Sequence, residues 1–287
     1  DVVQSVLQLE AAVQRDPTNA RAWFELGVKQ QENEREQQAI QALRRALELE
    51  PSHLPSWLAL AISSTNEGDR MGTFASVKEW VDRNERFQAA VAAHRASVGG
   101  VGAGADTFSG LIDCLIAMAR SEANGSVDAD IQIALAVLLN TNEEYAKAQD
   151  CFRAALAVRP EDWLLYNRVG ATMANSGQAE EAILYYNRAL ELNPAYIRAR
   201  FNLGISYINL QRYEEAASHI LDALVLQDSD RVGGPDDGRG IMSSALWDSL
   251  KTTSLHMQRA DLAALCERQD LEGTSRGAHN LEHEQEV

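Results

Sequence analysis

Apolar and small residues recur along this chain at helical spacing, in units of 34 residues. In residues 163–196 a first set falls at i, i+3, i+4 and i+7, on one face of an α-helix: Tyr166, Val169, Gly170 and Met173. A second set lies on one face of a following helix: Ala182, Ile183, Tyr186 and Ala189. No alternating strand pattern of useful length competes with them. The pattern therefore predicts an all-α fold built from pairs of amphipathic helices.

Five segments fit this template: residues 20–53, 54–87, 129–162, 163–196 and 197–230. Small residues occupy its eighth position throughout: Gly27, Ala61, Ala136, Gly170 and Gly204. Proline follows the second helix in three segments: Pro51, Pro160 and Pro194. A 34-residue period with small residues where two helices cross is typical of tetratricopeptide repeats. Because such units bury their apolar faces only against neighbours, we predict a tetratricopeptide superhelix of helix-turn-helix units.

The template also divides the chain into regions. Residues 1–87 hold a partial repeat and two full repeats, and residues 129–230 hold three. Residues 88–128 use 41 positions where a repeat needs 34, and glycines within 99–104 interrupt any helix there. We expect this irregular unit to be a degenerate hinge repeat. Residues 231–272 predict a loop and helices that cap the superhelix, and the polar residues 273–287 predict a disordered tail.

Charge narrows the range of partners. The chain has 26 Lys and Arg residues against 42 Asp and Glu residues, a formal net charge of −16. Nucleic acid and anionic membranes reward clustered cations, so neither is an expected partner. No run of 18 apolar residues is present, and the cysteines Cys114, Cys151 and Cys266 are odd in number and widely spaced. We expect a soluble cytoplasmic protein with core cysteines, and its start at Asp1 indicates a fragment.

Nothing in the sequence indicates catalysis or a cofactor. The glycines of residues 100–104 follow no strand and precede no Lys-Ser/Thr pair, so a linker is favoured over a phosphate-binding loop. His279 and His283 have a spacing that a metal can use, but they lie in the polar tail without a third ligand. No serine, histidine and aspartate can be joined into a nucleophilic motif. The sequence predicts a protein without enzymatic activity, metal or cofactor.

Asparagines and arginines gather on the predicted inner face of the first helices. The candidate peptide-binding residues are Asn33, Asn66, Asn167, Arg168, Ala171, Asn175, Arg198, Asn202 and Asn209. Asparagine is a poor helix former, but its amide both donates and accepts, so a ladder of amides can hold an extended peptide backbone. The arginines would bind the free carboxylate at the end of that peptide. The competing interpretation is that these asparagines only end helices or occupy turns.

Four strings in the chain are more specific than the repeat pattern: WFELGVKQQENEREQQAIQALRRALELEP, SSTNEGD, LLYNRVGATMANSGQ and YIRARFNLGISYINL. They resemble the repeat region of the peroxisomal targeting signal type 1 receptor family, whose members bind C-terminal Ser-Lys-Leu-like tripeptides. The resemblance implies a superhelix of seven repeats, split into two triplets by an irregular fourth, that encloses the tripeptide. It further implies a cytoplasmic receptor that cycles to the peroxisome or glycosome membrane.

The resemblance also implies roles for single residues. Asn167, Arg168 and Arg198 would engage the terminal carboxylate, although the family often has lysine where Arg168 stands. Backbone contacts would come from Asn33, Asn66, Asn202 and Asn209, and the border of the leucine pocket from Ala171 and Asn175. Glu32 or Glu34 is the acid expected nearest the middle lysine. The family docks at the membrane through an N-terminal region with Trp-x-x-x-Phe/Tyr repeats, which this chain lacks.

Two other functions remain open at this point. A tetratricopeptide co-chaperone would also grip a C-terminal carboxylate, but it needs several inner cations to hold an acidic Glu-Glu-Val-Asp tail, and a net charge of −16 repels such a ligand. A scaffold or adaptor module would bridge proteins, with the inner asparagines incidental. Dependence of binding on a free C-terminal carboxylate separates the scaffold from the receptor.

Overall fold

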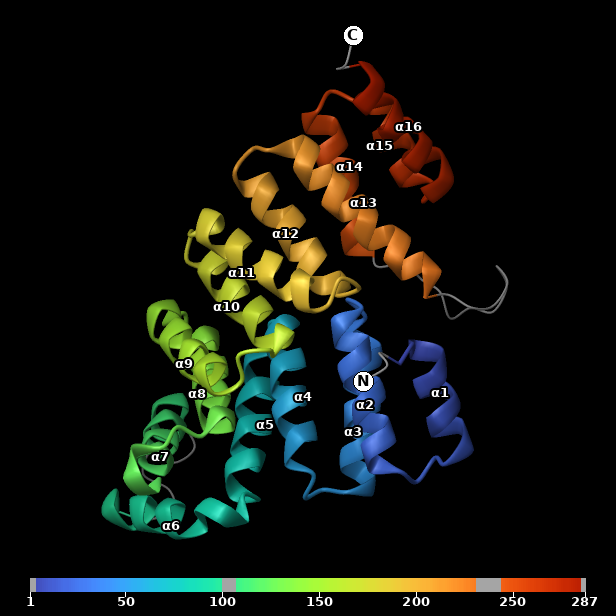
Figure 1. Cartoon of the computed structure of the whole chain (residues 1–287). Helices are drawn as coiled ribbons and strands as arrows, with labels where there is room; N and C mark the ends of the chain where they lie inside the picture. Colours follow the sequence, from blue (N-terminus) through green and yellow to red (C-terminus); the bar gives the residue numbers. More distant parts are fainter. Residues whose placement is uncertain (1–3, 100–106, 231–243, 285–287) are drawn as a thin grey trace.

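The chain folds into helix pairs that stack along a curved path (Figure 1). The computed structural model describes residues 4–99, 107–230 and 244–284, and no strand occurs among them. The first part comprises α1 (Val6–Arg15), α2 (Ala20–Glu32), α3 (Glu36–Leu49), α4 (Leu54–Asn66) and α5 (Arg70–Asp82). The irregular unit follows the short helix η1 (Glu85–Phe87) and contains α6 (Gln88–Ser97), α7 (Phe108–Arg120) and η2 (Ala123–Gly125). The predicted all-α fold is confirmed.

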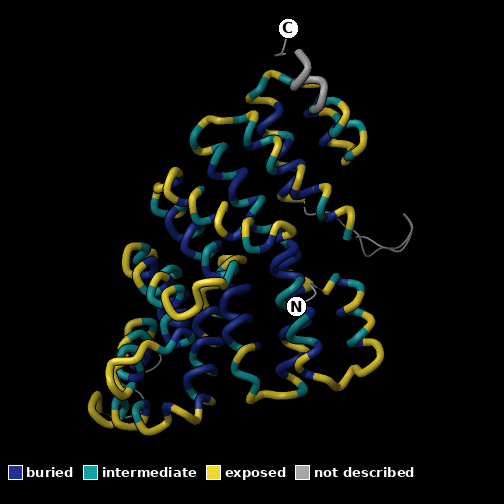
Figure 2. Tube along the Cα trace, in the orientation of Figure 1, coloured by how far each residue is buried: buried dark blue, intermediate teal, exposed yellow. Residues whose placement is uncertain are grey.

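The second part of the stack holds three regular repeats and the terminal helices. Its helices are α8 (Ala129–Thr141), α9 (Tyr145–Val158), α10 (Trp163–Asn175), α11 (Ala179–Leu192), α12 (Ile197–Asn209) and α13 (Tyr213–Ser229). The chain then ends in α14 (Ser244–His256), α15 (Ala260–Glu267) and α16 (Leu271–Glu284). Figure 2 shows buried residues on the inner sides of the helices and exposed residues on the outer rim and turns. Each repeat therefore shares its core with its neighbours.

The small residues of the template lie where the two helices of a repeat touch. At Gly170 an added Cβ would lie 2.7 Å from the ring of Tyr186, and at Gly204 the same distance from Ile220. Real Cβ atoms do not approach neighbours so closely, so these positions need glycine for packing. The template residues predicted from the sequence thus set the distance between paired helices.

The turn inside each regular repeat contains one residue with a left-handed backbone. It is the fifteenth residue of the template each time: Glu34 (φ 60°), Gly68 (φ 70°), Glu143 (φ 62°), Gly177 (φ 81°) and Gln211 (φ 59°). This conformation costs a side-chain-bearing residue roughly 1–2 kcal/mol, which glycine avoids. Three of the five repeats therefore carry a strained residue at the same place.

Relief of this strain should be measurable. Replacing Gln211 by glycine is expected to stabilise the protein by about 0.5 kcal/mol, because relief of the left-handed cost exceeds the extra chain entropy of glycine. The free energy of unfolding in urea gives the measurement, and Gln211→Ala, which keeps the Cβ, is the control. A Gln211→Gly variant less stable than the alanine variant would contradict the interpretation.

One template position differs in the repeat that precedes the irregular unit. Where regular repeats have a fully buried alanine, the repeat before the irregular unit has Trp80, which is 3% exposed. Its indole belongs to a core cluster that includes Val91 of α6 and Leu115 of α7. The larger side chain thus packs in the core that joins the regular repeat to the irregular unit.

The C-terminal end is more ordered than the sequence indicated. Helices α14 and α15 lie within residues 231–272, where the sequence predicts terminal helices, and Trp247 and Leu250 pack with residues of α12 and α13. The disordered tail predicted from residue 273 is wrong for residues 273–284, which belong to α16. Its first turn is held by Asp270, whose Oδ1 accepts a hydrogen bond from Gly273 N at 2.9 Å, and Leu271 packs against the terminal core. The side chains of His279 and His283 lie outside the described residues.

The cysteines lie in the helical packing. Cys114 and Cys266 are buried and Cys151 is half-buried. Burial raises the pKa of the Cys151 thiol to about 11, so it is a thiol rather than a nucleophilic thiolate at neutral pH. Within residues 4–99, 107–230 and 244–284, no helix is long and apolar enough to cross a membrane.

Candidate functional site

The first and the last full repeats meet at the turn between α2 and α3. Arg198, at the start of α12, donates from Nε to the Gln31 carbonyl at 3.0 Å. The same guanidinium forms ion pairs with Glu34, at 3.2 Å, and with Glu36. Burial alone would lower the pKa of Arg198, but the charges of Glu34 and Glu36 outweigh this effect and raise it. Repeats far apart in the sequence are therefore joined by a buried ionic contact.

Asn33 strengthens the same contact from the end of α2. This residue is 2% exposed, and its side-chain amide donates to the carboxylate of Asp230. Its backbone carbonyl accepts a hydrogen bond from Gln227 Nε2 at 2.9 Å. Asn66, the last residue of α4, donates to Glu36 Oε2 at 3.1 Å. Two of the predicted asparagines thus lie where the first and last full repeats meet.

Asn167 and Asn202 form a pair between neighbouring first helices. The Asn202 amide donates to Asn167 Oδ1 at 3.0 Å, from α12 to α10. Among the described residues, the Asn167 amide nitrogen and the Asn202 amide oxygen have no hydrogen-bond partner. This pair consequently presents one free donor and one free acceptor, the two groups that an extended backbone needs.

Arg168 is a cation without a direct hydrogen-bond or ion-pair partner among the described residues, although the charges of Asp162 and Glu36 act on it from a distance. It lies on α10 between Asn167 and the core residue Val169, and its guanidinium has no hydrogen-bond or ion-pair partner within the described part of the chain. Burial lowers its pKa, which means that the surroundings do not solvate the charge well. A half-buried arginine left in this state favours any anion that can reach it.

Arg168 lines a cavity of about 560 Å³ between the first and second parts of the stack. Its walls are mainly apolar and come from α2, α4, α5, η1 and the first turns of α8 and α10. The apolar lining residues are Phe24, Val28, Leu54, Pro55, Leu58, Ala59, Ile62, Trp80, Phe87, Ile133, Leu164 and Leu165. A cavity with mainly apolar walls and several charged lining residues is a common form of a binding site for a small ligand or side chain.

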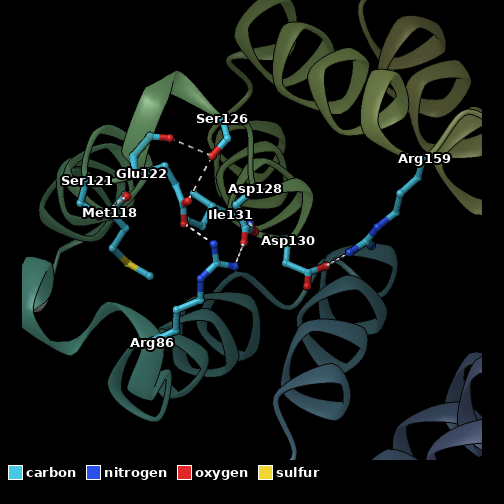
Figure 3. A network of polar contacts seen from close by, with 10 residues as sticks. Arg86, Met118, Ser121, Glu122, Ser126, Asp128, Asp130, Ile131 and Arg159 are labelled. Carbon is cyan, nitrogen blue, oxygen red and sulfur yellow. Dashed lines mark hydrogen bonds and ion pairs between the residues drawn. The ribbon is translucent and has the colours of Figure 1, made fainter.

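Ion pairs rim another part of this cavity (Figure 3). Arg86 binds Asp128 at 2.8 Å and Glu122 at 2.6 Å, which joins η1 to the residues before α8. Arg159, at the end of α9, binds Asp130 of α8 at 2.8 Å. The three cavity arginines therefore differ, because Arg86 and Arg159 are paired while Arg168 is not.

The remaining predicted residues make fewer contacts through their side chains. Asn175 and Asn209 are exposed last residues of α10 and α12, and no partner for their side chains occurs among the described residues. Ala171 is half-buried on α10. Asn33 and Asn66 also lie at helix ends. The position of all four asparagines therefore also fits the competing interpretation, in which these residues end helices.

The two acids proposed for a ligand lysine lie in different surroundings. Glu32 accepts a hydrogen bond from Trp163 Nε1 at 3.3 Å and pairs with Lys29 at 3.4 Å. Glu34 pairs with Arg198 instead. Burial raises the pKa of both carboxyl groups against the opposing cations. Sequence reasoning missed Glu36, Gln227 and Asp230, because only the curvature of the stack brings them to the site.

Comparison with known sequences identifies the class. Tetratricopeptide repeat models match residues 4–53 and 133–197, and a second such model matches residues 174–232. Together with the paired helices, these matches define a tetratricopeptide repeat protein. Among solved structures, the chain is similar to MamA with a TM-score of 0.47 and 16% identity, over 67% of this chain and 99% of that one.

Curated relatives narrow the class to a family. The chain is 43% identical to the peroxisomal targeting signal receptor of Yarrowia lipolytica over 91% of its own length and 44% of the relative. It is 38% identical to the receptor of the same name from Candida albicans, again over 91% and 44%. The chain belongs to the peroxisomal targeting signal receptor family. It spans less than half the length of these relatives.

Proposed function

We propose that this chain is the cargo-binding part of an import receptor and holds the C-terminal Ser-Lys-Leu-type signal of peroxisomal or glycosomal matrix proteins. The observation that carries the proposal is the unpaired guanidinium of Arg168 beside an apolar cavity. A peptide that ends in leucine carries both matching groups on its last residue: a carboxylate for the guanidinium and a branched apolar side chain for the cavity. A charge-assisted hydrogen bond to that carboxylate would contribute about 1.5–3 kcal/mol.

The amide groups beside Arg168 suit the peptide backbone. The free donor of Asn167 and the free acceptor of Asn202 would pair with a C=O and an N–H of the ligand without regard to its side chains. Asn33, Asn66, Ala171, Asn175, Arg198 and Asn209 complete the proposed site. This division, in which amides hold the backbone and the cavity selects the last side chain, matches the recognition of a short signal on many different cargo proteins.

The relatives' name supports the same function for this chain. We propose that the whole protein is cytoplasmic and cycles to the peroxisome or glycosome membrane. Docking at the membrane would involve parts of the relatives that lie outside the 44% of their length that this chain matches. An acidic chaperone tail is a weaker candidate ligand, because Glu32, Glu34 and Glu36 surround the cations.

Fluorescence polarisation of labelled peptides tests the proposal. The chain is titrated into a peptide ending in Ser-Lys-Leu, made once as the free acid and once as the C-terminal amide. A peptide ending in Glu-Glu-Val-Asp as the free acid is the third arm. We expect saturable binding of the first peptide alone, because only it presents both carboxylate and leucine without excess negative charge. Equal binding of acid and amide would overturn the proposal, and binding of the acidic peptide alone would favour a co-chaperone.

The asparagine pair provides a prediction of moderate size. Asn202→Ala should weaken binding of the free-acid Ser-Lys-Leu peptide by about 1 kcal/mol, roughly fivefold in Kd, because one backbone hydrogen bond is lost. The same titration measures the effect. Asn187→Ala, on the exposed face of α11, removes an identical amide elsewhere and should leave the Kd unchanged. Equal Kd values for Asn202→Ala and the unmodified chain would exclude Asn202 from the site.

A further inference from the structure

A second hollow, separate from the Arg168 cavity, lies between α7, α8 and α9, where the irregular unit meets the next regular repeat (Figure 1). Its volume is about 550 Å³, and none of its lining residues lines the Arg168 cavity. On α8, Ile133 faces the Arg168 cavity, whereas Leu135 and Leu139 face the second hollow. The two sites therefore lie on different faces of the same helix.

Apolar side chains line this hollow, called the α7–α9 groove, at helical spacing. Ile112 and Ile116 lie four residues apart on α7, and Leu135 and Leu139 lie four residues apart on α8. Cys151 contributes from α9. The leucines are buried, but the isoleucines are only half-buried against the core. Residues four apart share one face of a helix, so two apolar stripes line the groove, as in sites that receive the apolar face of a partner helix.

The rim of the α7–α9 groove is acidic. Its lining residues carry three carboxylates, those of Asp113, Glu144 and Asp150, and one ammonium group, that of Lys147. Lys147 pairs with Glu144 at 2.5 Å and so neutralises one carboxylate. Asp150 lies 3.6 Å from the exposed cation Arg153, and the Asp150 side chain is 80% exposed. Asp113 is exposed and has no hydrogen-bond or ion-pair partner among the described residues. Two carboxylates at the rim are therefore available to cations of a partner.

We propose that the α7–α9 groove docks an amphipathic helix of a partner protein, whose apolar stripe enters the groove and whose flanking lysines or arginines face Asp113 and Asp150. Burial of apolar surface supplies most of the affinity, and the exposed charges set the choice of partner. A second copy of this chain fits poorly, because its formal charge of −16 would bring further carboxylates to an acidic rim. Since the groove and the Arg168 cavity lie on different faces of α8, the chain can hold this helix and a C-terminal peptide at once.

Three labelled model helices test the docking surface by fluorescence polarisation. The first is a C-terminally amidated peptide of about 15 residues with leucines at i, i+4, i+7 and i+11 and lysines on both sides of that stripe. The second has the same composition with the leucines spread around the helix, and the third has glutamate in place of each lysine. We expect saturable binding of the first peptide alone, because only it presents both the stripe and the cations.

Charge reversal at the rim shows whether the peptide binds in the groove. Asp113→Lys/Asp150→Lys should weaken binding of the first peptide about tenfold, because two favourable charge contacts become repulsive. The matched control Glu161→Lys/Glu180→Lys makes the same change in net charge at exposed positions outside the groove, and its Kd should stay within about threefold of the unmodified chain. Circular dichroism melting checks that both variants fold.

Methyl NMR of the unmodified chain locates the bound peptide directly. The first peptide should shift the methyl resonances of Ile112 and Ile116 and leave that of Ile220, in the terminal core, unchanged. The proposal is overturned if the first peptide shows no saturable binding up to about 1 mM, or if the glutamate peptide binds as tightly. Equal Kd values for the two charge-reversed variants, or displacement of the first peptide by a free-acid Ser-Lys-Leu peptide, would likewise place the binding outside the α7–α9 groove.

Discussion

Arg168→Ala is expected to weaken binding of a free-acid Ser-Lys-Leu peptide roughly 100-fold, the equivalent of about 2–3 kcal/mol. The size follows from the surroundings, since the guanidinium lines a mainly apolar cavity and has no partner among the described residues. A charge-assisted bond formed there is poorly screened by water. Because no internal ion pair is broken by the substitution, the folded state should retain or slightly gain stability.

The control for Arg168 lies in the same cavity. Arg159→Ala removes the same side chain, but Arg159 is paired with Asp130 at 2.8 Å and is not available to a ligand. Polarisation titrations should give a Kd within about threefold of the unmodified chain for Arg159→Ala. Arg168→Lys keeps the charge without the planar fork and should fall between the two. Equal losses for the alanine variants would mean that overall charge, not a contact at Arg168, controls affinity.

The second large effect concerns stability. Trp80→Ala should lower the free energy of unfolding by about 3–5 kcal/mol, as for other buried tryptophans. The indole is 3% exposed and belongs to the core that connects α5 to the irregular unit. Alanine, the residue of this template position in the other repeats, would leave a void here because the following unit is irregular and cannot close the gap.

Urea unfolding followed by circular dichroism measures this loss. Trp80→Phe retains most of the apolar volume and should lose less than half as much as Trp80→Ala. A loss below about 1 kcal/mol for the alanine variant would mean that the irregular unit collapses onto the vacated space. That result would also show that the joint between the two parts of the stack adapts its shape easily.

The fold was predictable from the sequence because the same helix-pair pattern recurs in every repeat. Gly170 and Gly204 could be recognised as helix-crossing positions since the same position is small in every unit. The left-handed turns of Glu143 and Gln211 were not recognisable, because neither residue type favours that conformation and only the shared template position gives it away. Helix α16 was missed because its sequence is polar and its stability comes from packing on the terminal core.

The site was predictable in part. Side chains one repeat apart, such as Asn167 and Asn202, meet because neighbouring helices stack in register. The partners of Arg198 were not predictable, since they lie more than four repeats away and depend on the total curvature of the stack. Sequence spacing defines the face on which a residue lies, but it does not define which distant faces converge.

The contact between the α2–α3 turn and α12 makes the site sensitive to the geometry of the whole superhelix. Every packed interface between residue 34 and residue 198 contributes a small rotation. These rotations together set the distance from Glu34 to Arg198. A substitution that changes the rotation at any one of these interfaces therefore also changes the position of α12 relative to the α2–α3 turn. Substitutions far from the proposed site therefore change ligand affinity while every residue that touches the ligand stays the same.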